Sequence, residues 1–267
     1  MTASQGTRDL LFPGASDAEV SGRIDRVRRF NLGMGVLHGV QGAAILALAT
    51  GFSIPIVYRP LTGPPGSASE AITLFDLRID WAVAAFLFIS ALAHLLIASP
   101  WLFPRYRAML LLGRNDFRWI EYSLSASLMA VLIGSLAGID DVAAVIPIFG
   151  ANAAMIFFGL VQERYERPGG RLLPFWLGSL IGLVPWLAIG VYLSGIGTES
   201  QAPGFVYAIF VSLLLFFMSF AVNMWLQYRR IGRWRDYLYG ERVYVILSLV
   251  AKSALAWQVF AGTLASD

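Results

Sequence analysis

Seven long apolar segments constrain the fold of this chain more than any other feature. A helix needs about 20 residues to cross about 30 Å of hydrocarbon, and seven segments reach that length. Their approximate limits are Phe30–Gly51, Trp81–Ser99, Phe117–Ile139, Ala143–Gln162, Leu172–Leu193, Phe205–Tyr228 and Val243–Leu264. Only 14% of the residues are charged, against about a quarter in soluble domains. The sequence therefore predicts an all-α membrane protein, a bundle of seven transmembrane helices.

We expect residues 1–267 to form a single domain. Residues 1–29 are polar and charged, unlike a signal peptide, which has an early apolar core. Only Asp140–Asp141 separates the third apolar segment from the fourth, which predicts a tight antiparallel turn. In residues 52–79, two β-favouring runs flank a turn rich in Gly, Pro and Ser. This pattern predicts an extracellular β-hairpin, with an irregular loop as the alternative.

The arginines predict the orientation of the bundle. Seventeen of the 19 lie in the N-terminal segment and in the second, fourth and sixth connections, whereas Arg59 and Arg78 lie on the opposite side. Positive residues mark the cytoplasmic side, so we expect a multi-pass protein of the cell membrane with the N-terminus inside and the C-terminus outside. The arginines either set this topology alone or also engage acidic lipids or a cytoplasmic partner protein. Because they form no single groove, nucleic-acid binding is not expected.

The only lysine of the chain, Lys252, lies in the middle of the last apolar segment. A charge at that depth costs roughly 2.5–3.5 kcal/mol on insertion scales. Lysine can lose its proton when buried and attack a carbonyl, whereas arginine stays protonated. The position therefore suggests a Schiff base with an aldehyde. The alternative is a structural lysine paired with an acid inside the bundle.

Glu121 is the predicted partner of Lys252, because it lies about one turn inside the third segment while the other acids fall at segment ends or in loops. An opposite charge within about 4–6 Å would hold a proton on the lysine nitrogen. Ser125 follows Glu121 by four residues and Ser248 precedes Lys252 by four, so each shares a helix face with its neighbour. Their hydroxyls either serve this site or bond to their own helix backbone.

Both histidines, His38 and His94, fall inside apolar segments, and Gln41 follows His38 by nearly one turn. The alternating direction of the segments places both histidines and Glu121 in the same half of the membrane. The pattern suggests a polar cavity that relays or holds a proton, with ordinary hydrogen-bonded packing as the alternative. A metal site is not expected, because two imidazoles and one carboxylate are a poor ligand set.

The strings "RWIEYSLSASLM" and "SLVAKSALAWQVFAGTL" resemble the heliorhodopsin family of retinal-binding proteins. The predicted orientation agrees, because ordinary microbial rhodopsins place the N-terminus outside. The resemblance implies all-trans retinal bound covalently to Lys252, with Glu121 as its only carboxylate counter-ion and Ser125 and Ser248 nearby. Further retinal contacts implied by it are Tyr122, Met129, Asn152, Pro185, Trp186 and Phe217, and the polar cavity implied by it contains His38, Gln41, Ser90, His94, Asn115, Arg118 and Trp119. The alternative for the aromatic and methionine positions is ordinary helix packing.

The resemblance also implies a homodimer whose interface includes the hairpin, and a slow light sensor. Pumps of the wider rhodopsin class carry an aspartate where this chain has Ser248, and an acid about three turns past the counter-ion where it has none. We therefore expect a photoreceptor that signals through its cytoplasmic face. The alternatives are a light-gated channel or weak transporter, and a chromophore-free seven-helix transporter. Enzyme activity is not expected, because the sequence contains no nucleotide motif and no nucleophile–base pair facing water.

Overall fold

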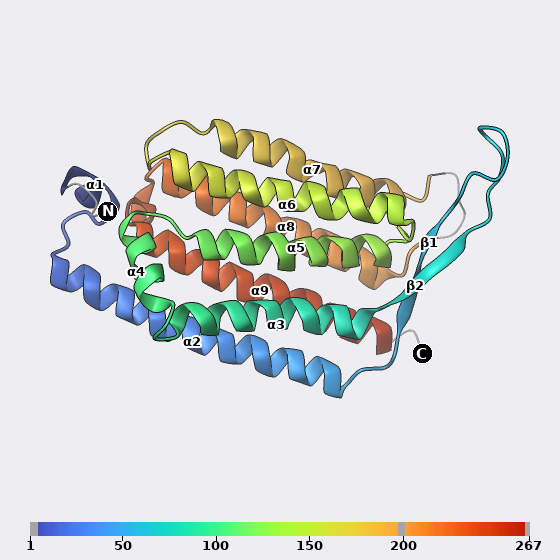
Figure 1. Ribbon diagram of the computed structural model, residues 1–267, viewed down its shortest axis with the longest axis horizontal. Coiled ribbons are helices and arrows are strands. Elements are labelled where there is room, and N and C mark those ends of the chain that lie inside the picture. The colour runs from blue at the N-terminus through green and yellow to red at the C-terminus, as the bar shows by residue number, and fades with distance from the viewer. Residues whose placement is uncertain (1–4, 197–200, 265–267) are drawn as a thin grey trace.

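The computed structural model describes residues 5–196 and 201–264, and these residues form a bundle of long helices with a small sheet at one end (Figure 1). The elements are α1 (Gln5–Leu11), α2 (Asp17–Ala47), β1 (Ser53–Tyr58), β2 (Ile72–Arg78), α3 (Ile79–Ala98), α4 (Phe103–Leu111), α5 (Asp116–Leu136), α6 (Val142–Tyr165), α7 (Leu173–Leu193), α8 (Gly204–Tyr228), the short 3-10 helix η1 (Gly232–Arg235) and α9 (Tyr237–Leu264). Within the described ranges, seven helices are long and apolar enough to cross a membrane. This confirms the predicted fold class. Residues 1–4 and 265–267 of the predicted domain lie outside the described residues.

Three of the spanning helices extend beyond the apolar segments that predicted them. Helix α2 begins at Asp17 instead of Phe30, because Ser16 and Glu19 form a capping box in which each side chain accepts the other's backbone N–H. Helix α6 continues to Tyr165, and α9 begins at Tyr237 instead of Val243. The extra turns are polar, so hydropathy did not reveal them, and those of α6 and α9 carry Glu163 and Glu241 into the bundle.

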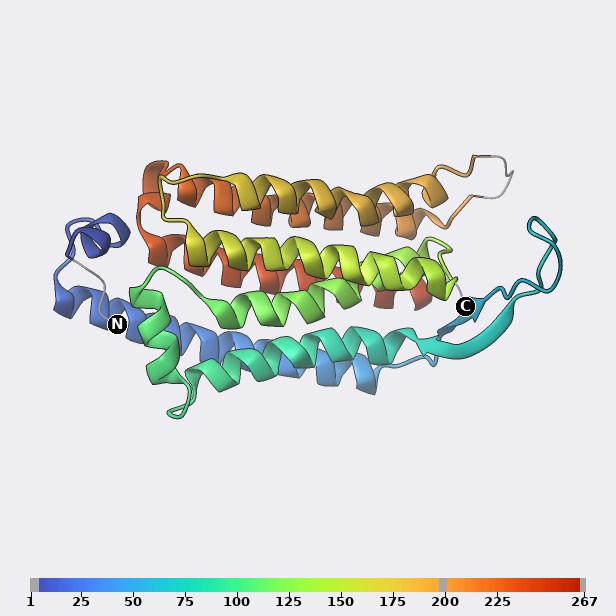
Figure 2. The ribbon, with the colours of Figure 1, turned by 45° about the horizontal axis from the view of Figure 1, so that its top comes forward.

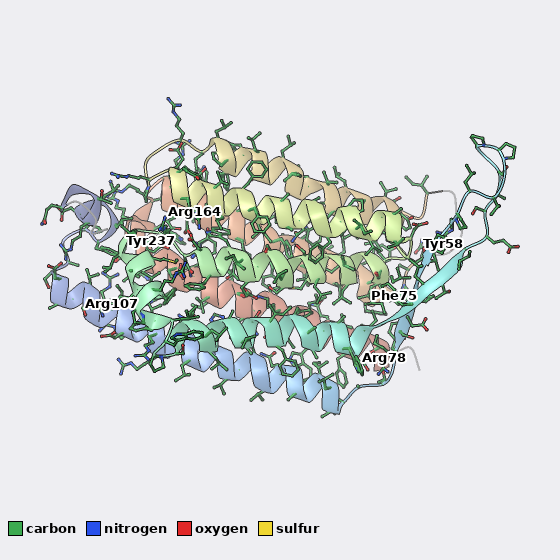
Figure 3. All side chains as sticks on the ribbon, viewed as in Figure 1. Tyr58, Phe75, Arg78, Arg107, Arg164 and Tyr237 are labelled. Carbon is green, nitrogen blue, oxygen red and sulfur yellow. The ribbon has the colours of Figure 1, made fainter. Side chains whose placement is uncertain are left out.

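Two short helices, α1 and α4, lie at the end of the bundle that holds most of the arginines, here called the arginine-rich end (Figures 1 and 2). The sequence did not predict them, because neither is long enough to stand out in hydropathy. Their apolar residues form a separate core with the start of α2, in which Leu11, Ile24 and Tyr106 are almost fully buried. Figure 3 shows Arg107, Arg164 and Tyr237 at this end.

The predicted hairpin is confirmed at the opposite end of the bundle, here called the hairpin end (Figure 1). Strands β1 and β2 are antiparallel, with Ser53 opposite Arg78 and an irregularity between Ile56 and Val57. The predicted tight turn at Asp140–Asp141 is confirmed as well, since α5 ends at Leu136 and α6 begins at Val142. The Val57 N–H donates to Asp140 O at 3.0 Å, so the hairpin is hydrogen-bonded to the turn between α5 and α6.

Apolar side chains fill the half of the bundle that faces the hairpin. Phe86 of α3, Leu132 of α5, Ile189 of α7 and Leu255 of α9 are fully buried in one cluster. The buried charges of α5, Asp116, Arg118 and Glu121, lie instead in its first two turns, toward the arginine-rich end. The fold therefore separates an apolar half from a half that holds charge.

Candidate functional site

Lys252 is buried on α9 and is held by one side chain of α5 and one of its own helix. Its Nζ donates to Glu121 Oε1 at 2.9 Å and to Ser248 Oγ at 2.9 Å. Ser90 of α3 donates to the same Glu121 oxygen at 2.6 Å. The Lys252 and Glu121 side chains are only 3% and 7% exposed. We call Ser90, Glu121, Ser248 and Lys252 the lysine cluster.

Two α5 residues flank the lysine cluster. Ser125 is fully buried and lies beside the Glu121 carboxylate, but its hydroxyl is outside hydrogen-bonding geometry. Lys252 Nζ lies 5.0 Å from the centre of the Tyr122 ring, and the Tyr122 hydroxyl donates to Tyr244 O at 2.9 Å. The aromatic ring therefore covers the ammonium group with its negative face.

The two histidines form a buried stacked pair beside the lysine cluster. The rings of His38 and His94 are nearly parallel, at 8°, with centroids 5.6 Å apart. His94 Nδ1 is hydrogen-bonded to Asn31 Oδ1 at 2.7 Å, whereas neither ring nitrogen of His38 has a partner among the described residues. His94 and Glu121 line the same small cavity.

Gln41 does not join the histidines as the sequence analysis expected. Its amide oxygen accepts a hydrogen bond from Trp257 Nε1 at 3.1 Å, at an exposed position on the bundle. Gln41 lies three residues after His38, and its side chain meets α9 near the surface; its place in the polar cavity stays a prediction. The polar residues that adjoin His94 are Asn31, which the sequence analysis did not single out, and Glu121.

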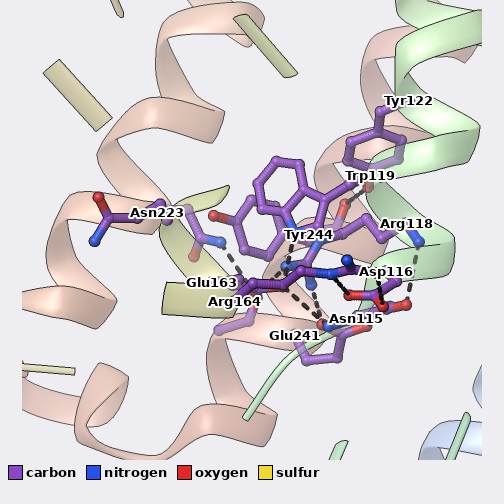
Figure 4. Close-up of polar contacts among 12 residues, drawn as sticks. Asn115, Asp116, Arg118, Trp119, Tyr122, Glu163, Arg164, Asn223, Glu241 and Tyr244 are labelled. Carbon is purple, nitrogen blue, oxygen red and sulfur yellow. Dashed lines mark hydrogen bonds and ion pairs between the residues drawn. The ribbon is translucent and has the colours of Figure 1, made fainter. Parts of the chain in front are cut away.

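Arg118 forms a second buried charge cluster, close to the arginine-rich end (Figure 4). Its two terminal nitrogens donate separately to Glu163 of α6 and Glu241 of α9. Asn115 and Trp119 complete the set, because Asn115 Nδ2 donates to Glu241 at 2.6 Å and Trp119 Nε1 donates to Glu163 at 2.6 Å. We call Asn115, Arg118, Trp119, Glu163 and Glu241 the arginine cluster.

The sequence analysis missed both acids of the arginine cluster. It placed Glu163 and Glu241 just outside the fourth and seventh apolar segments, and it expected acids there to be at span ends. Both are buried because α6 and α9 extend beyond those segments. The available signal was Arg118 itself, since an arginine inside a predicted span requires a carboxylate partner.

A cavity of about 420 Å³ opens beside the lysine cluster, and Lys252 and Ser248 form part of its wall. The rest of the wall comes mainly from aromatic and methionine side chains. These are Trp119, Tyr122, Met129, Met155, Phe175, Trp176, Phe217, Met218, Phe220, Met224 and Tyr244. The volume lies within the range of about 300–1,000 Å³ typical of small-molecule sites. The cavity therefore suits a long apolar ligand with one group that reacts with or binds to an amine.

Within residues 5–196 and 201–264, no group of three or more His, Cys, Asp or Glu side chains could hold a metal ion. Comparison with known protein families identifies the chain by its sequence: the family model for heliorhodopsins matches residues 27–264. The chain belongs to the heliorhodopsin family. No curated protein matches it.

Family membership makes this heliorhodopsin a multi-pass membrane protein and a retinal-binding photoreceptor of a class that is generally not catalytic. The residues present fit retinal. The cavity is apolar along its length, and the chain's only lysine amine stands at its wall beside a carboxylate. The roles of the individual residues stay predictions.

The cavity divides the predicted retinal contacts of this heliorhodopsin into two groups. Tyr122, Met129 and Phe217 line it, together with Ser248 and Lys252. Asn152, Pro185 and Trp186 are buried but are not among its lining residues. Asn152 donates to Ser127 Oγ at 3.1 Å, and Trp186 packs edge-on behind Phe217, with ring centroids 5.1 Å apart.

Glycines of this heliorhodopsin shape the cavity where large side chains meet a helix backbone. A Cβ on Gly159 of α6 would lie 2.5 Å from the Trp119 ring, and one on Gly178 of α7 would lie 2.8 Å from Phe158 Cβ. Small residues let membrane helices approach closely. Gly159 therefore allows Trp119 to reach both the cavity and Glu163.

Proposed function

We propose that this heliorhodopsin is a light sensor that holds all-trans retinal covalently on Lys252 as a protonated Schiff base, with Glu121 as counter-ion. One observation carries the proposal. The only lysine lies in the wall of a large apolar cavity, with its Nζ 2.9 Å from a buried carboxylate. A structural ion pair alone gives no reason for the adjoining cavity.

When bound, retinal supplies a light-absorbing polyene that isomerises from all-trans to 13-cis. Lys252 anchors the ligand, and Glu121 holds the proton at Nζ, because an opposite charge at this distance favours the charged form. Ser90 and Ser248 orient the carboxylate and the nitrogen through their hydrogen bonds. Tyr122, Met129 and Phe217 exclude water from the cavity and define its shape.

We further propose that the protein senses light with a slow photocycle and does not pump ions. A pump requires polar groups along the whole membrane path, whereas the half facing the hairpin is filled by residues such as Phe86, Leu132 and Leu255. The charged and polar clusters all lie toward the arginine-rich end. This asymmetry favours a sensor over a light-gated channel or weak transporter.

The arginine-rich end is proposed to face the cytoplasm of the cell membrane, because positive residues mark that side. There it would meet a signalling partner protein.

The hairpin is proposed to join two copies into a homodimer, since β2 leaves Leu74 and Phe75 about half exposed, at 49% and 53%. Exposed apolar side chains on a sheet are typical of an interaction surface.

The test is a visible absorption spectrum of the membrane-expressed protein with all-trans retinal, beside Lys252→Ala. A visible band in the wild type that the variant lacks is expected. The absence of a band in both proteins would refute the proposal and leave Lys252 as a structural ion-pair residue. Light-driven pH and current measurements on the pigmented protein then test transport, and a sustained photocurrent would contradict the sensor.

A further inference from the structure

The arginine cluster holds an unbalanced number of charges. One guanidinium faces two carboxylates, and the side chains of Arg118, Glu163 and Glu241 are 3%, 3% and 1% exposed. The neighbouring charges do not correct the balance, because Arg164 pairs with Asp116 at 2.7 Å and Lys252 pairs with Glu121. Among the described residues, the other titratable groups near the cluster include His94, which lines the same small cavity as Glu241, and tyrosines 106, 122, 228, 237 and 244, which are neutral when protonated. With both glutamates ionised the cluster carries one negative charge, and burying an uncompensated charge is costly.

The two carboxylates differ in the groups that a proton bound to them would contact. Glu163 accepts from the Asn115 backbone N–H, from Trp119 Nε1 and from Arg118. These groups are donors only, so a proton on Glu163 would face another proton at each contact. Glu241 also accepts from two donor-only groups, Asn115 Nδ2 at 2.6 Å and Arg118. Its Oε1 differs in that it also contacts the Tyr106 hydroxyl at 3.2 Å, and a hydroxyl can rotate to accept a hydrogen bond. Of the two acids, Glu241 is therefore the one with a partner that can accept from a bound proton.

A small cavity connects Glu241 with the lysine cluster. It measures about 30 Å³, and its polar lining consists of Asn31, His94, Asn115, Arg118, Glu121 and Glu241. Glu163 does not line it. A polar cavity of this size holds an ordered water when it offers two to four hydrogen-bond partners. A second connection runs along hydrogen bonds from His94 through Asn31 and Tyr106 to Glu241, with Asn31 Nδ2 3.4 Å from the Tyr106 hydroxyl.

We propose that Glu241 is a proton-binding site, joined to Lys252 and Glu121 through this cavity. After light absorption an N–H bond at Lys252 Nζ breaks and an O–H bond at Glu241 Oε1 forms. The arginine cluster thereby becomes neutral, and the proton stays inside the protein. In the dark the same proton returns to Nζ, so no co-reactant is consumed. This inference rests on the proposed function, because it concerns the fate of the proton held at Lys252.

Light-minus-dark infrared difference spectroscopy of the retinal-loaded protein in lipid tests the site. The wild type is expected to gain the C=O stretch of a protonated carboxyl, and Glu241→Gln is expected to lose that band. Glu241→Asp should keep a carboxyl band at a shifted frequency. The matched control is Asp116→Asn, an acid at the same end that pairs with Arg164 and does not line the cavity, and it should leave the band unchanged.

Three further measurements distinguish the ways in which this test could fail. Glu163→Gln removes the residual negative charge, so the band should keep its position and lose intensity. If Glu241→Gln does not fold, Tyr106→Phe retains Glu241, removes its hydroxyl partner and is expected to shift the band. Infrared titration of the chromophore-free protein measures the same carboxyl without retinal, and acid should produce a band that Glu241→Gln lacks.

A protein without visible absorbance would refute the proposed function. A pigmented protein whose carboxyl band is absent, or persists unchanged in Glu241→Gln, would overturn the proton site alone.

Discussion

The lysine cluster and the arginine cluster begin three residues apart on α5 but use buried charge differently. In the lysine cluster one ammonium meets one carboxylate, and two serine hydroxyls complete the contacts. In the arginine cluster one guanidinium bridges two carboxylates from different helices. Lysine loses its proton readily when buried, whereas arginine stays charged and its rigid fork suits two acceptors. In the first cluster the cation is suited to chemistry, and in the second the cation is suited to joining helices.

The largest effect should come from exchanging the two cations. Lys252→Arg keeps the positive charge, but a guanidinium that stays protonated does not attack an aldehyde. We expect complete loss of the visible band when all-trans retinal is added, measured by absorption spectroscopy. Arg118→Lys is the matched control and should retain a band, because Lys252 remains. A visible band in Lys252→Arg would show that an arginine can replace the lysine at this site, and that the choice of cation does not distinguish the two clusters.

Removing the arginine should mainly destabilise the fold. Arg118→Met leaves two buried carboxylates without their cation, and breaking a buried ion pair typically costs about 3–5 kcal/mol. The loss can be measured as the change in free energy of unfolding in detergent. Arg164→Met removes a cation whose side chain is 42% exposed from a partner, Asp116, whose side chain is 10% exposed, so the loss is expected to be smaller than in Arg118→Met, where all three side chains are buried. Similar losses in both variants would contradict a special structural role for Arg118.

A smaller effect is expected where the arginine cluster meets the large cavity. Gly159→Ala brings a Cβ to 2.5 Å from the Trp119 ring, and overpacking of this kind costs about 1–3 kcal/mol. Because Trp119 lines the cavity and also donates to Glu163, the substitution should shift the visible band and lower the unfolding temperature together. Gly150→Ala meets nothing within 4 Å and should change neither. A band shift without any loss of stability would separate the two functions of Trp119.

The smallest effect concerns the exposed charges at the hairpin end. The Ala143 N–H, and after it Arg59, hold the pKa of Asp141 below its ordinary value. A carboxyl group whose pKa is lower in the folded than in the unfolded protein stabilises the fold at pH values above its unfolded pKa. This stabilisation is lost as the pH falls through its folded pKa. Hydrogen exchange of residues 53–58, corrected for intrinsic rates, should therefore become faster at acidic pH. Asp141→Asn should abolish this dependence, and an unchanged pH profile in that variant would refute it.

The sequence predicted the parts of the molecule whose signal is local or chemically unusual. The seven helices follow from apolar length, the hairpin from its turn residues, and the Lys252–Glu121 contact from the rarity of charge in a membrane segment. Glu163 and Glu241 were not predicted, because their burial depends on polar helical turns that hydropathy assigns to loops. Asn152 and Trp186 were predicted as retinal contacts and stay predictions; the sequence did not indicate that they lie outside the lining of the cavity, because helix rotation and packing decide which side chains reach it.

Helix α5 is fixed at both of its ends. At one end Arg118 joins it to α6 and α9, and at the other the turn after it accepts the Val57 N–H of the hairpin, while Arg59 binds Asp141 at 2.9 Å. A helix held at both ends is expected to resist sliding along its axis. If the charge beside Glu121 changes as proposed above, the displacement is therefore expected in the helices packed against the middle of α5. The mechanical output of the proposed sensor is thus expected sideways, in the plane of the membrane, before it reaches either surface.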